Sequence, residues 1–128
     1  MLLTVRLGTN DKARSKAFYD ATFAALGAPP AQTMDQYPIL MYKLPGGPSL
    51  IIGPPRDGKP ATHANGGTIL FDAPSEEAVH AWHAAGLANG GTCEGEPEAK
   101  PQAGGAVGAY LRDPDGNKLG AYCGLGMT

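Results

Sequence analysis

The feature of this sequence that most constrains its fold is one internal repeat with an offset of 64 residues, the separation of Thr4 from Thr68. Residues 4–7 and 68–71 are short apolar stretches, and each leads through a polar turn into a helical pattern. Residues 17–19 fall on residues 81–83 at the same offset. A period this long that occurs only twice indicates one duplicated supersecondary unit rather than a solenoid array.

The first unit begins with a strand and continues with a helix. Apolar and polar side chains alternate along residues 4–7, which is typical of a strand with one buried face. Asn10 or Asp11 can cap the helix, and Gly27 can end it. We expect its core-facing stripe to be Ala13, Ala17, Phe18, Ala21 and Ala25.

The second unit repeats this pattern with clearer helix signals. Ser75 is the expected cap, and Glu76 and Glu77 occupy the first turn, where carboxylates suit the helix dipole. Gly90 and Gly91 end the helix. We expect the core-facing residues to be Ala78, Val79, Trp82 and Leu87.

Three short extended stretches follow each helix, so each unit reads βαβββ. Tight turns at residues 45–47 and 113–117 join the last two strands of each unit; proline fixes one φ there and glycine supplies a positive one. At 128 residues the chain fits a single domain, with module 1 at about 1–54, a linker at about 55–65 and module 2 at about 66–128. The six stretches lie near residues 32–36, 39–44, 49–53, 92–96, 107–112 and 118–123.

Composition excludes several classes of function. The net charge is −2 and the isoelectric point is about 5.8, so we expect no nucleic-acid partner. No apolar run approaches the roughly 20 residues of a membrane span, and the N-terminus lacks the pattern of a signal peptide. We therefore expect a cytoplasmic protein without a membrane partner. Cys93 and Cys123 do not make a disulfide framework, and we expect both to be structural thiols.

Specific motifs accompany the duplication. Residues 112–119 read Arg-Asp-Pro-Asp-Gly-Asn-Lys-Leu, residues 16–20 read Lys-Ala-Phe-Tyr-Asp, and Leu26-Gly27 follows. With the repeated βαβββ pattern, the whole chain resembles the glyoxalase/bleomycin resistance protein/dioxygenase superfamily, also called the vicinal oxygen chelate superfamily. The resemblance implies an α+β fold in which two βαβββ modules form a curled, cup-shaped mixed sheet with helices on the outside.

The resemblance also implies where a metal would bind. In the family, up to four ligands, usually His, Glu or Gln, come from the first and last strands of each module. The corresponding positions here are Thr4, Ile51, Thr68 and Gly120. Isoleucine and glycine have no side-chain donor, and a threonine hydroxyl is a poor ligand for a transition metal. We therefore expect neither a metal nor another cofactor in the cup.

Strand alternation predicts which residues line the cup. Arg6 is either a rim charge or a group that grips an anionic or carbonyl-bearing ligand. Tyr110 and Tyr122 are either core aromatics or ligand contacts, and Gly120 can make room for a ligand. The predicted lining also includes Thr4, Lys43, Ile51 and Leu70, and the opposite, helix-facing set is Val5, Leu7, Leu50, Ile52, Ile69, Phe71, Leu119 and Ala121. The candidate ligand-binding residues are Arg6, Met41, Ser49, Thr68, Asp72, Tyr110, Arg112 and Tyr122.

The histidines and one loop stay open at this level. His80 and His83 lie one turn apart on the second helix, and without an evident third ligand we expect both on a solvated face. His63 lies in the linker, which in the family can approach the cup mouth. The Pro- and Gly-rich residues 95–105 form either a lid or a surface loop.

The leading hypothesis is a metal-independent family member that binds a small organic molecule in the cup, as a homodimer. The bleomycin-binding proteins offer an analogy, because they sequester a drug without metal chemistry. One alternative is a metal-independent lyase, isomerase or dioxygenase-like enzyme that uses Tyr110, Tyr122, Arg6 or His63. Another is a non-catalytic protein-interaction module.

Overall fold

The computed structural model describes residues 1–125, and its element order repeats once. The 3₁₀ helix of the second module has no counterpart in the first. No helix within residues 1–125 is long and apolar enough to cross a membrane. The first module contains β1 (Thr4–Gly8), α1 (Lys12–Ala25), β2 (Gln32–Met34), β3 (Tyr37–Lys43) and β4 (Ser49–Gly53). The second contains β5 (Ile69–Asp72), α2 (Glu76–Ala88), β6 (Thr92–Ala99), the 3₁₀ helix η1 (Pro101–Ala103), β7 (Val107–Arg112) and β8 (Lys118–Cys123).

Each module forms its own open, four-stranded mixed sheet. The strand orders are β1-β4-β3-β2 and β5-β8-β7-β6, and in each sheet only the first pair is parallel. Arg6 pairs with Ile51 in one sheet, and Leu70 pairs with Gly120 in the other, so equivalent positions are partners. The two βαβββ modules predicted from the repeat are confirmed, and the fold is α+β.

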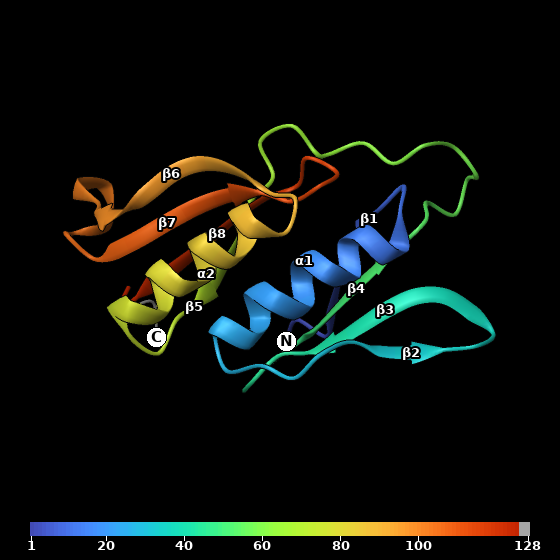
Figure 1. The fold of residues 1–128 in the computed structure, drawn as a ribbon, viewed down its shortest axis with the longest axis horizontal. Coiled ribbons are helices and arrows are strands. Elements are labelled where there is room, and N and C mark those ends of the chain that lie inside the picture. The colour runs from blue at the N-terminus through green and yellow to red at the C-terminus, as the bar shows by residue number, and fades with distance from the viewer. Residues whose placement is uncertain (126–128) are drawn as a thin grey trace.

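The helices cover one face of each sheet and contact each other. Figure 1 shows α1 and α2 side by side, each lying over strands of its own module. The side chains that alternation assigned to the helix-facing side all belong to the core or pack against it. The prediction of which face of each strand is buried is therefore confirmed. Leu50, Ile52, Leu119 and Ala121 are among its most buried members.

Helix α1 is rotated from the predicted orientation. Phe18 is buried as predicted, but Ala13 and Ala17 are exposed, and Tyr19 and Phe23 complete the buried face. Aromatic rings bury far more apolar area than alanine methyl groups, so the rings set the orientation of the helix.

In α2 the buried residues Val79, Trp82, His83 and Gly86 follow helical spacing around the indole ring. That stripe leaves Leu87 45% exposed and buries His83, which is 5% exposed. Ala78, Val79 and Trp82 are buried as predicted, whereas the predictions of a core-facing Leu87 and a solvated His83 were wrong; of the two histidines on α2, His80 is the exposed one.

The segment 95–105 is mostly regular structure. Strand β6 continues to Ala99, and η1 follows directly, so the irregular part is short. Register shifts between Cys93 and Gly95 and between Gly95 and Glu98 mark extra residues in β6 relative to β7. Figure 1 shows β6 as a long, curved strand at the outer edge of the second sheet.

The β7–β8 turn ties the second module to the start of α1. The side chain of Asp115 is 1% exposed. It accepts hydrogen bonds from the Asn10 backbone N–H at 2.9 Å, the Ser15 hydroxyl at 3.2 Å and the Arg14 guanidinium at 3.1 Å. The Asn117 amide donates to the Gly8 carbonyl at 3.3 Å. The turn motif is therefore a contact between modules as well as a hairpin.

Candidate functional site

The four positions expected to correspond to the family's metal ligands lie on or beside the first and last strands. Thr4 is in β1, Ile51 in β4 and Gly120 in β8, and Thr68 directly precedes β5. The Thr4 hydroxyl donates a hydrogen bond to the Ser49 carbonyl at 3.1 Å. The set offers two threonine hydroxyls and no imidazole or carboxylate, so it does not fit a transition metal.

The space beside Gly120 is filled by neighbouring side chains. A Cβ atom at Gly120 would lie 2.7 Å from the Leu70 side chain and 2.9 Å from the Tyr110 ring. Tyr110 is also the cross-strand partner of Gly120. The expectation that Gly120 leaves room for a ligand is therefore wrong, because the aromatic ring of its partner lies there.

A matching pair lies beside it on the same two strands. The Tyr122 ring covers its cross-strand partner Gly108, where a Cβ atom would lie 2.3 Å from the ring. The Tyr110 and Tyr122 hydroxyls share a hydrogen bond of 2.7 Å, and the ring centroids are 5.7 Å apart at an interplanar angle of 78°. Two glycines thus let two tyrosines lie against the helix-free face of the second sheet.

The environment of Tyr122 favours its protonated form. Burial raises its pKa, the hydrogen bond with Tyr110 raises it further, and together they bring it to about 12. At neutral pH the Tyr122 phenol is protonated, so it can donate a hydrogen bond but is poorly suited to abstract a proton.

A cavity of about 520 Å³ lies over the same face. Lys118 places its ammonium group 5.2 Å from the centroid of the Tyr110 ring, within the range of a cation–π contact. Lys100 is 6% exposed, and its ammonium group donates to the Glu96 carbonyl at 2.8 Å. The lining residues are Thr68, Leu70, Glu94, Gly95, Lys100, Gln102, Tyr110 and Lys118.

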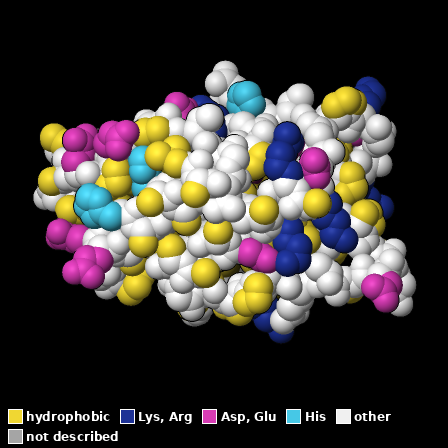
Figure 2. Space-filling view, in the orientation of Figure 1, with side chains coloured by type: hydrophobic (Ala, Val, Ile, Leu, Met, Phe, Trp, Pro, Cys, Tyr) yellow, Lys and Arg dark blue, Asp and Glu magenta, His cyan; other side chains and the backbone are white. Residues whose placement is uncertain are grey.

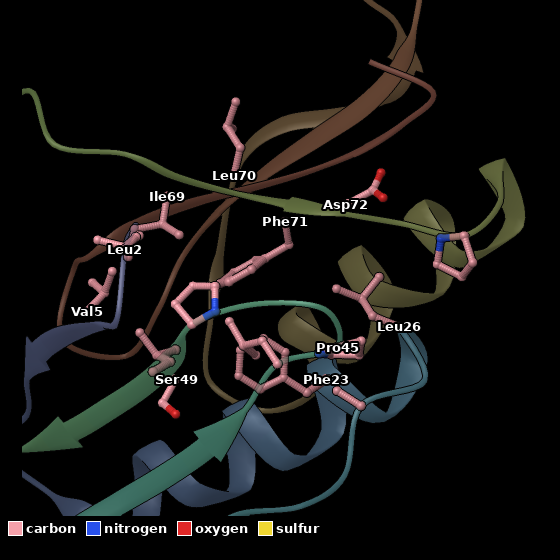
Figure 3. A pocket seen from close by; sticks show the side chains of 15 residues that line it. Leu2, Val5, Phe23, Leu26, Pro45, Ser49, Ile69, Leu70, Phe71 and Asp72 are labelled. Atoms are coloured by element: carbon pink, nitrogen blue, oxygen red, sulfur yellow. The ribbon is translucent and has the colours of Figure 1, made fainter. Parts of the chain in front are cut away.

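A second, more apolar cavity of about 410 Å³ lies between the modules. Figure 3 shows β5 along one side of it, with the end of α1 and the β3–β4 turn on the other. Its walls come from segments far apart in the chain, which is why strand alternation alone did not reveal it. The lining residues are Leu2, Val5, Phe23, Leu26, Ala28, Leu44, Pro45, Pro48, Ser49, Leu50, Ile69, Leu70, Phe71, Asp72 and Pro74.

The eight candidate ligand-binding residues do not gather in one cavity of the single chain. Thr68 and Tyr110 line the cavity over the second sheet, whereas Ser49 and Asp72 line the cavity between the modules. The remaining four residues line neither cavity. Arg6 donates to the Pro54 carbonyl at 2.8 Å, and Met41 is half-buried in β3. Arg112 pairs with Glu94 at 2.6 Å, and the Tyr122 hydroxyl shares a hydrogen bond with Tyr110.

His63 lies against the β7–β8 turn. A Cβ atom placed at Gly116 would be 2.9 Å from its Nδ1 atom. His63 is not among the residues that line either cavity. The linker that carries it also contacts the first module, since Asn10 exchanges two hydrogen bonds with the Ala61 backbone.

Solved structures of similar proteins share this arrangement. A glyoxalase/bleomycin resistance protein from Albidiferax ferrireducens T118 is 44% identical, with a TM-score of 0.87 over 96% of this chain and 98% of that one. A glyoxalase-related enzyme from Fulvimarina pelagi is 22% identical, with a TM-score of 0.76 over 96% of this chain and 87% of that one. A lactoylglutathione lyase from Agrobacterium tumefaciens is 22% identical, with a TM-score of 0.66 over 98% of this chain and 94% of that one.

The proteins from Fulvimarina pelagi and Agrobacterium tumefaciens share the fold with this chain, whereas the protein from Albidiferax ferrireducens T118 is also similar in sequence. The comparison with curated proteins gave no match. The sequence profile of the Glyoxalase/Bleomycin resistance protein/Dioxygenase superfamily matches residues 2–120. Together with the duplicated βαβββ modules, these similarities place the chain in the Glyoxalase/Bleomycin resistance protein/Dioxygenase superfamily.

Proposed function

We propose that this protein binds a small organic molecule against the helix-free face of its second sheet, without a transition metal at Thr4, Ile51, Thr68 and Gly120. The observation that carries the proposal is the cavity of about 520 Å³ over Tyr110 and Lys118. Its volume lies in the range of about 300–1,000 Å³ that is usual for small-molecule sites. Its walls combine an aromatic ring, an aliphatic side chain and several hydrogen-bonding groups.

The lining supports a ligand with a carboxylate or carbonyl group. Lys118 and Lys100 bring two ammonium groups to the wall, where Lys100 is paired with Glu98 at 3.3 Å and the Glu94 carboxylate is paired with Arg112. The amide of Gln102 adds a further donor. A planar, negatively charged molecule can therefore lie against the Tyr110 ring and accept a hydrogen bond from Lys118.

A homodimer would complete this site. The cavity is open to solvent in the single chain, so a partner chain is needed to enclose the ligand. Residues 1–54 contain five basic residues (Lys and Arg) and three acidic ones (Asp and Glu), so module 1 is positively charged. Residues 66–128 contain three basic and eight acidic residues, so module 2 is negatively charged. Opposite charges on the two modules favour a two-fold dimer in which module 1 of one chain faces module 2 of the other.

The site gives less support to the alternatives. A metal-independent lyase, isomerase or dioxygenase-like enzyme needs a group that exchanges protons near neutral pH, and the raised pKa of Tyr122 works against that role. A protein-interaction module without a ligand does not require a hollow with converging polar groups.

Ligand-observed NMR with a library of aromatic and aliphatic carboxylates, in the presence of a metal chelator, tests the proposal. We expect hits whose affinity falls about tenfold or more in Lys118→Met, because a hydrogen bond to a charged group contributes about 1.5–3 kcal/mol. Lys59→Met, which removes an exposed ammonium group in the linker, is the matched control and should bind like the wild type. Absence of hits, or equal affinity in both variants, would refute this site.

A further inference from the structure

Three metal-ligating side chains meet outside the cavities described above. His83 lies on α2 and is 5% exposed, and its Nε2 atom is 3.2 Å from the Cys93 sulfur. The Cys93 sulfur is 3.4 Å from Oε1 of Glu96. The three donor atoms all lie within 4.8 Å of one another, and this is the one such His/Cys/Asp/Glu group of three among residues 1–125.

Irregularities in β6 bring Cys93 and Glu96 to the same side. In a regular strand, residues three apart point to opposite faces. Here one register shift lies between Cys93 and Gly95, and a second lies between Gly95 and Glu98. Each extra residue resets the alternation, as β-bulges do when they re-aim a side chain. Sequence alternation alone therefore missed Cys93 and Glu96 as partners for His83.

Two of the three separations between donor atoms are close to those around a tetrahedral zinc ion, and the third, between His83 Nε2 and Glu96 Oε1, is within 4.8 Å. With bonds of about 2.3 Å to sulfur and 2.0–2.2 Å to nitrogen and oxygen, tetrahedral geometry separates neighbouring ligand atoms by about 3.5 Å. The contacts of 3.2 Å and 3.4 Å agree with that separation. A thiolate, an imidazole and a carboxylate are also the ligand types that zinc takes in proteins.

We propose that His83 Nε2, Cys93 Sγ and Glu96 Oε1 form a binding site for one zinc-class divalent cation. Cys93 and Glu96 face solvent, so water can occupy the fourth position. The site is distinct from the family positions at Thr4, Ile51, Thr68 and Gly120, which lie in or directly before β1, β4, β5 and β8. It joins α2 to β6, the strand that supplies Glu94 and Gly95 to the cavity wall.

The surroundings of this site suit a cation. Strand β6 contains Glu94, Glu96 and Glu98, and α2 begins with Glu76 and Glu77. Figure 2 shows Asp, Glu and His side chains gathered at one end of the molecule, while the Lys and Arg side chains lie mostly toward the other end, with further Asp and Glu side chains among them. Attraction by this acidic end raises the local concentration of divalent cations.

Titration with Co²⁺ tests the site, because a cysteine thiolate bound to cobalt gives a charge-transfer absorption band. We expect the wild-type chain to bind one Co²⁺ per chain with such a band, and Zn²⁺ to displace it. Cys93→Ser should abolish the band. Glu96→Gln and His83→Gln should weaken Co²⁺ binding more than tenfold, at least the loss expected for removing an outer-shell partner.

Two variants serve as matched controls. Cys123→Ser removes the other free cysteine, and His80→Gln removes an exposed histidine one turn from His83. Both should keep the band and the affinity of the wild type. Because Cys93 and Glu96 are exposed, their variants should keep the wild-type circular dichroism spectrum. A wild type without a thiolate band, a band that disappears with Cys123 instead of Cys93, or unchanged affinity in Glu96→Gln would overturn the proposal.

Discussion

Asp20 joins α1 to the loop and the strand that pack beside it. Its carboxylate accepts hydrogen bonds from Lys16 at 2.6 Å, the Tyr42 hydroxyl at 2.7 Å and the Ala31 backbone N–H at 3.0 Å. Burial alone would raise the pKa of Asp20, but these hydrogen bonds outweigh it, and the net pKa is lowered. The charged form is therefore the one that stabilises the fold.

The lowered pKa of Asp20 predicts a specific pH dependence. The unfolded chain has an aspartate pKa of about 3.9, so Asp20 stabilises the fold above that pH and loses this effect as the pH falls through its lower folded value. Asp20→Asn should lower the free energy of unfolding by about 1–3 kcal/mol at pH 7. In urea titrations, the difference in free energy of unfolding between Asp20→Asn and the wild type should shrink from pH 7 to pH 3. A difference that stays constant with pH would contradict this assignment.

At the scale of elements, cross-strand packing between β7 and β8 explains two glycines. Gly108 and Gly120 have no positive φ, so their conformation does not require glycine. Each instead lies under the ring of its tyrosine partner, Tyr122 and Tyr110 respectively. An aromatic ring that covers a cross-strand glycine is a known way to stabilise such a position in a sheet.

Gly108→Ala should destabilise the protein by about 1–3 kcal/mol, because the new methyl group would overlap the Tyr122 ring and overpack the sheet. Gly47→Ala is the control, since a Cβ atom there has no neighbour within 4 Å and the residue has no positive φ. Urea unfolding of both variants measures the difference. In a Tyr122→Ala background the cost of Gly108→Ala should largely disappear; an unchanged cost would show that the ring is not its cause.

At the scale of the whole molecule, a motif that forms a turn also joins the modules. Asp115 is almost fully buried against the N-terminus of α1, where it satisfies a backbone N–H, a hydroxyl and a guanidinium. A carboxylate at a helix N-terminus also interacts favourably with the helix dipole. The second module therefore stabilises the first helix of the first module.

Asp115→Ala should lower the free energy of unfolding by about 1–2 kcal/mol, because it removes the acceptor of the buried Ser15 hydroxyl and of the more exposed Asn10 N–H and Arg14 guanidinium. Asp35→Ala, which removes an exposed carboxylate between β2 and β3, should have a small effect, within about 0.5 kcal/mol. Hydrogen exchange adds a readout of position. In Asp115→Ala we expect the backbone amides at the start of α1 to exchange faster. If only the amides of the β7–β8 turn exchanged faster, the turn would not stabilise α1.

The proposed homodimer makes a prediction for the assembled protein. Leu2 and Leu70 are 63% and 44% exposed and both border the apolar cavity between the modules, so they are candidates for the contact between chains. Sedimentation should give twice the chain mass of 13.1 kDa for the wild type, and Leu2→Asp should shift it toward the monomer. Leu87→Asp on α2 is the control and should leave the dimer intact. A monomeric wild type would contradict the dimer without excluding the ligand cavity.

The sequence by itself determined the two βαβββ modules, the buried face of their strands and the turn positions. These depend on local rules: side chains alternate along a strand, helix ends need caps, and hairpins need residues with suitable φ. The six extended stretches after the helices therefore lie close to the observed strands. The rotation of α1 was less well predicted, because alanines satisfy the periodic pattern although aromatic rings dominate burial.

Only the tertiary structure decided which side chains meet. Tyr110 fills the space beside Gly120 because two strands pair in one register, and His83 reaches Cys93 and Glu96 because register shifts in β6 change the direction of its side chains. The apolar cavity needs α1, β5 and the β3–β4 turn together. Such contacts join residues far apart in the chain, and they depend on how modules pack and where strands bulge, which local patterns do not encode.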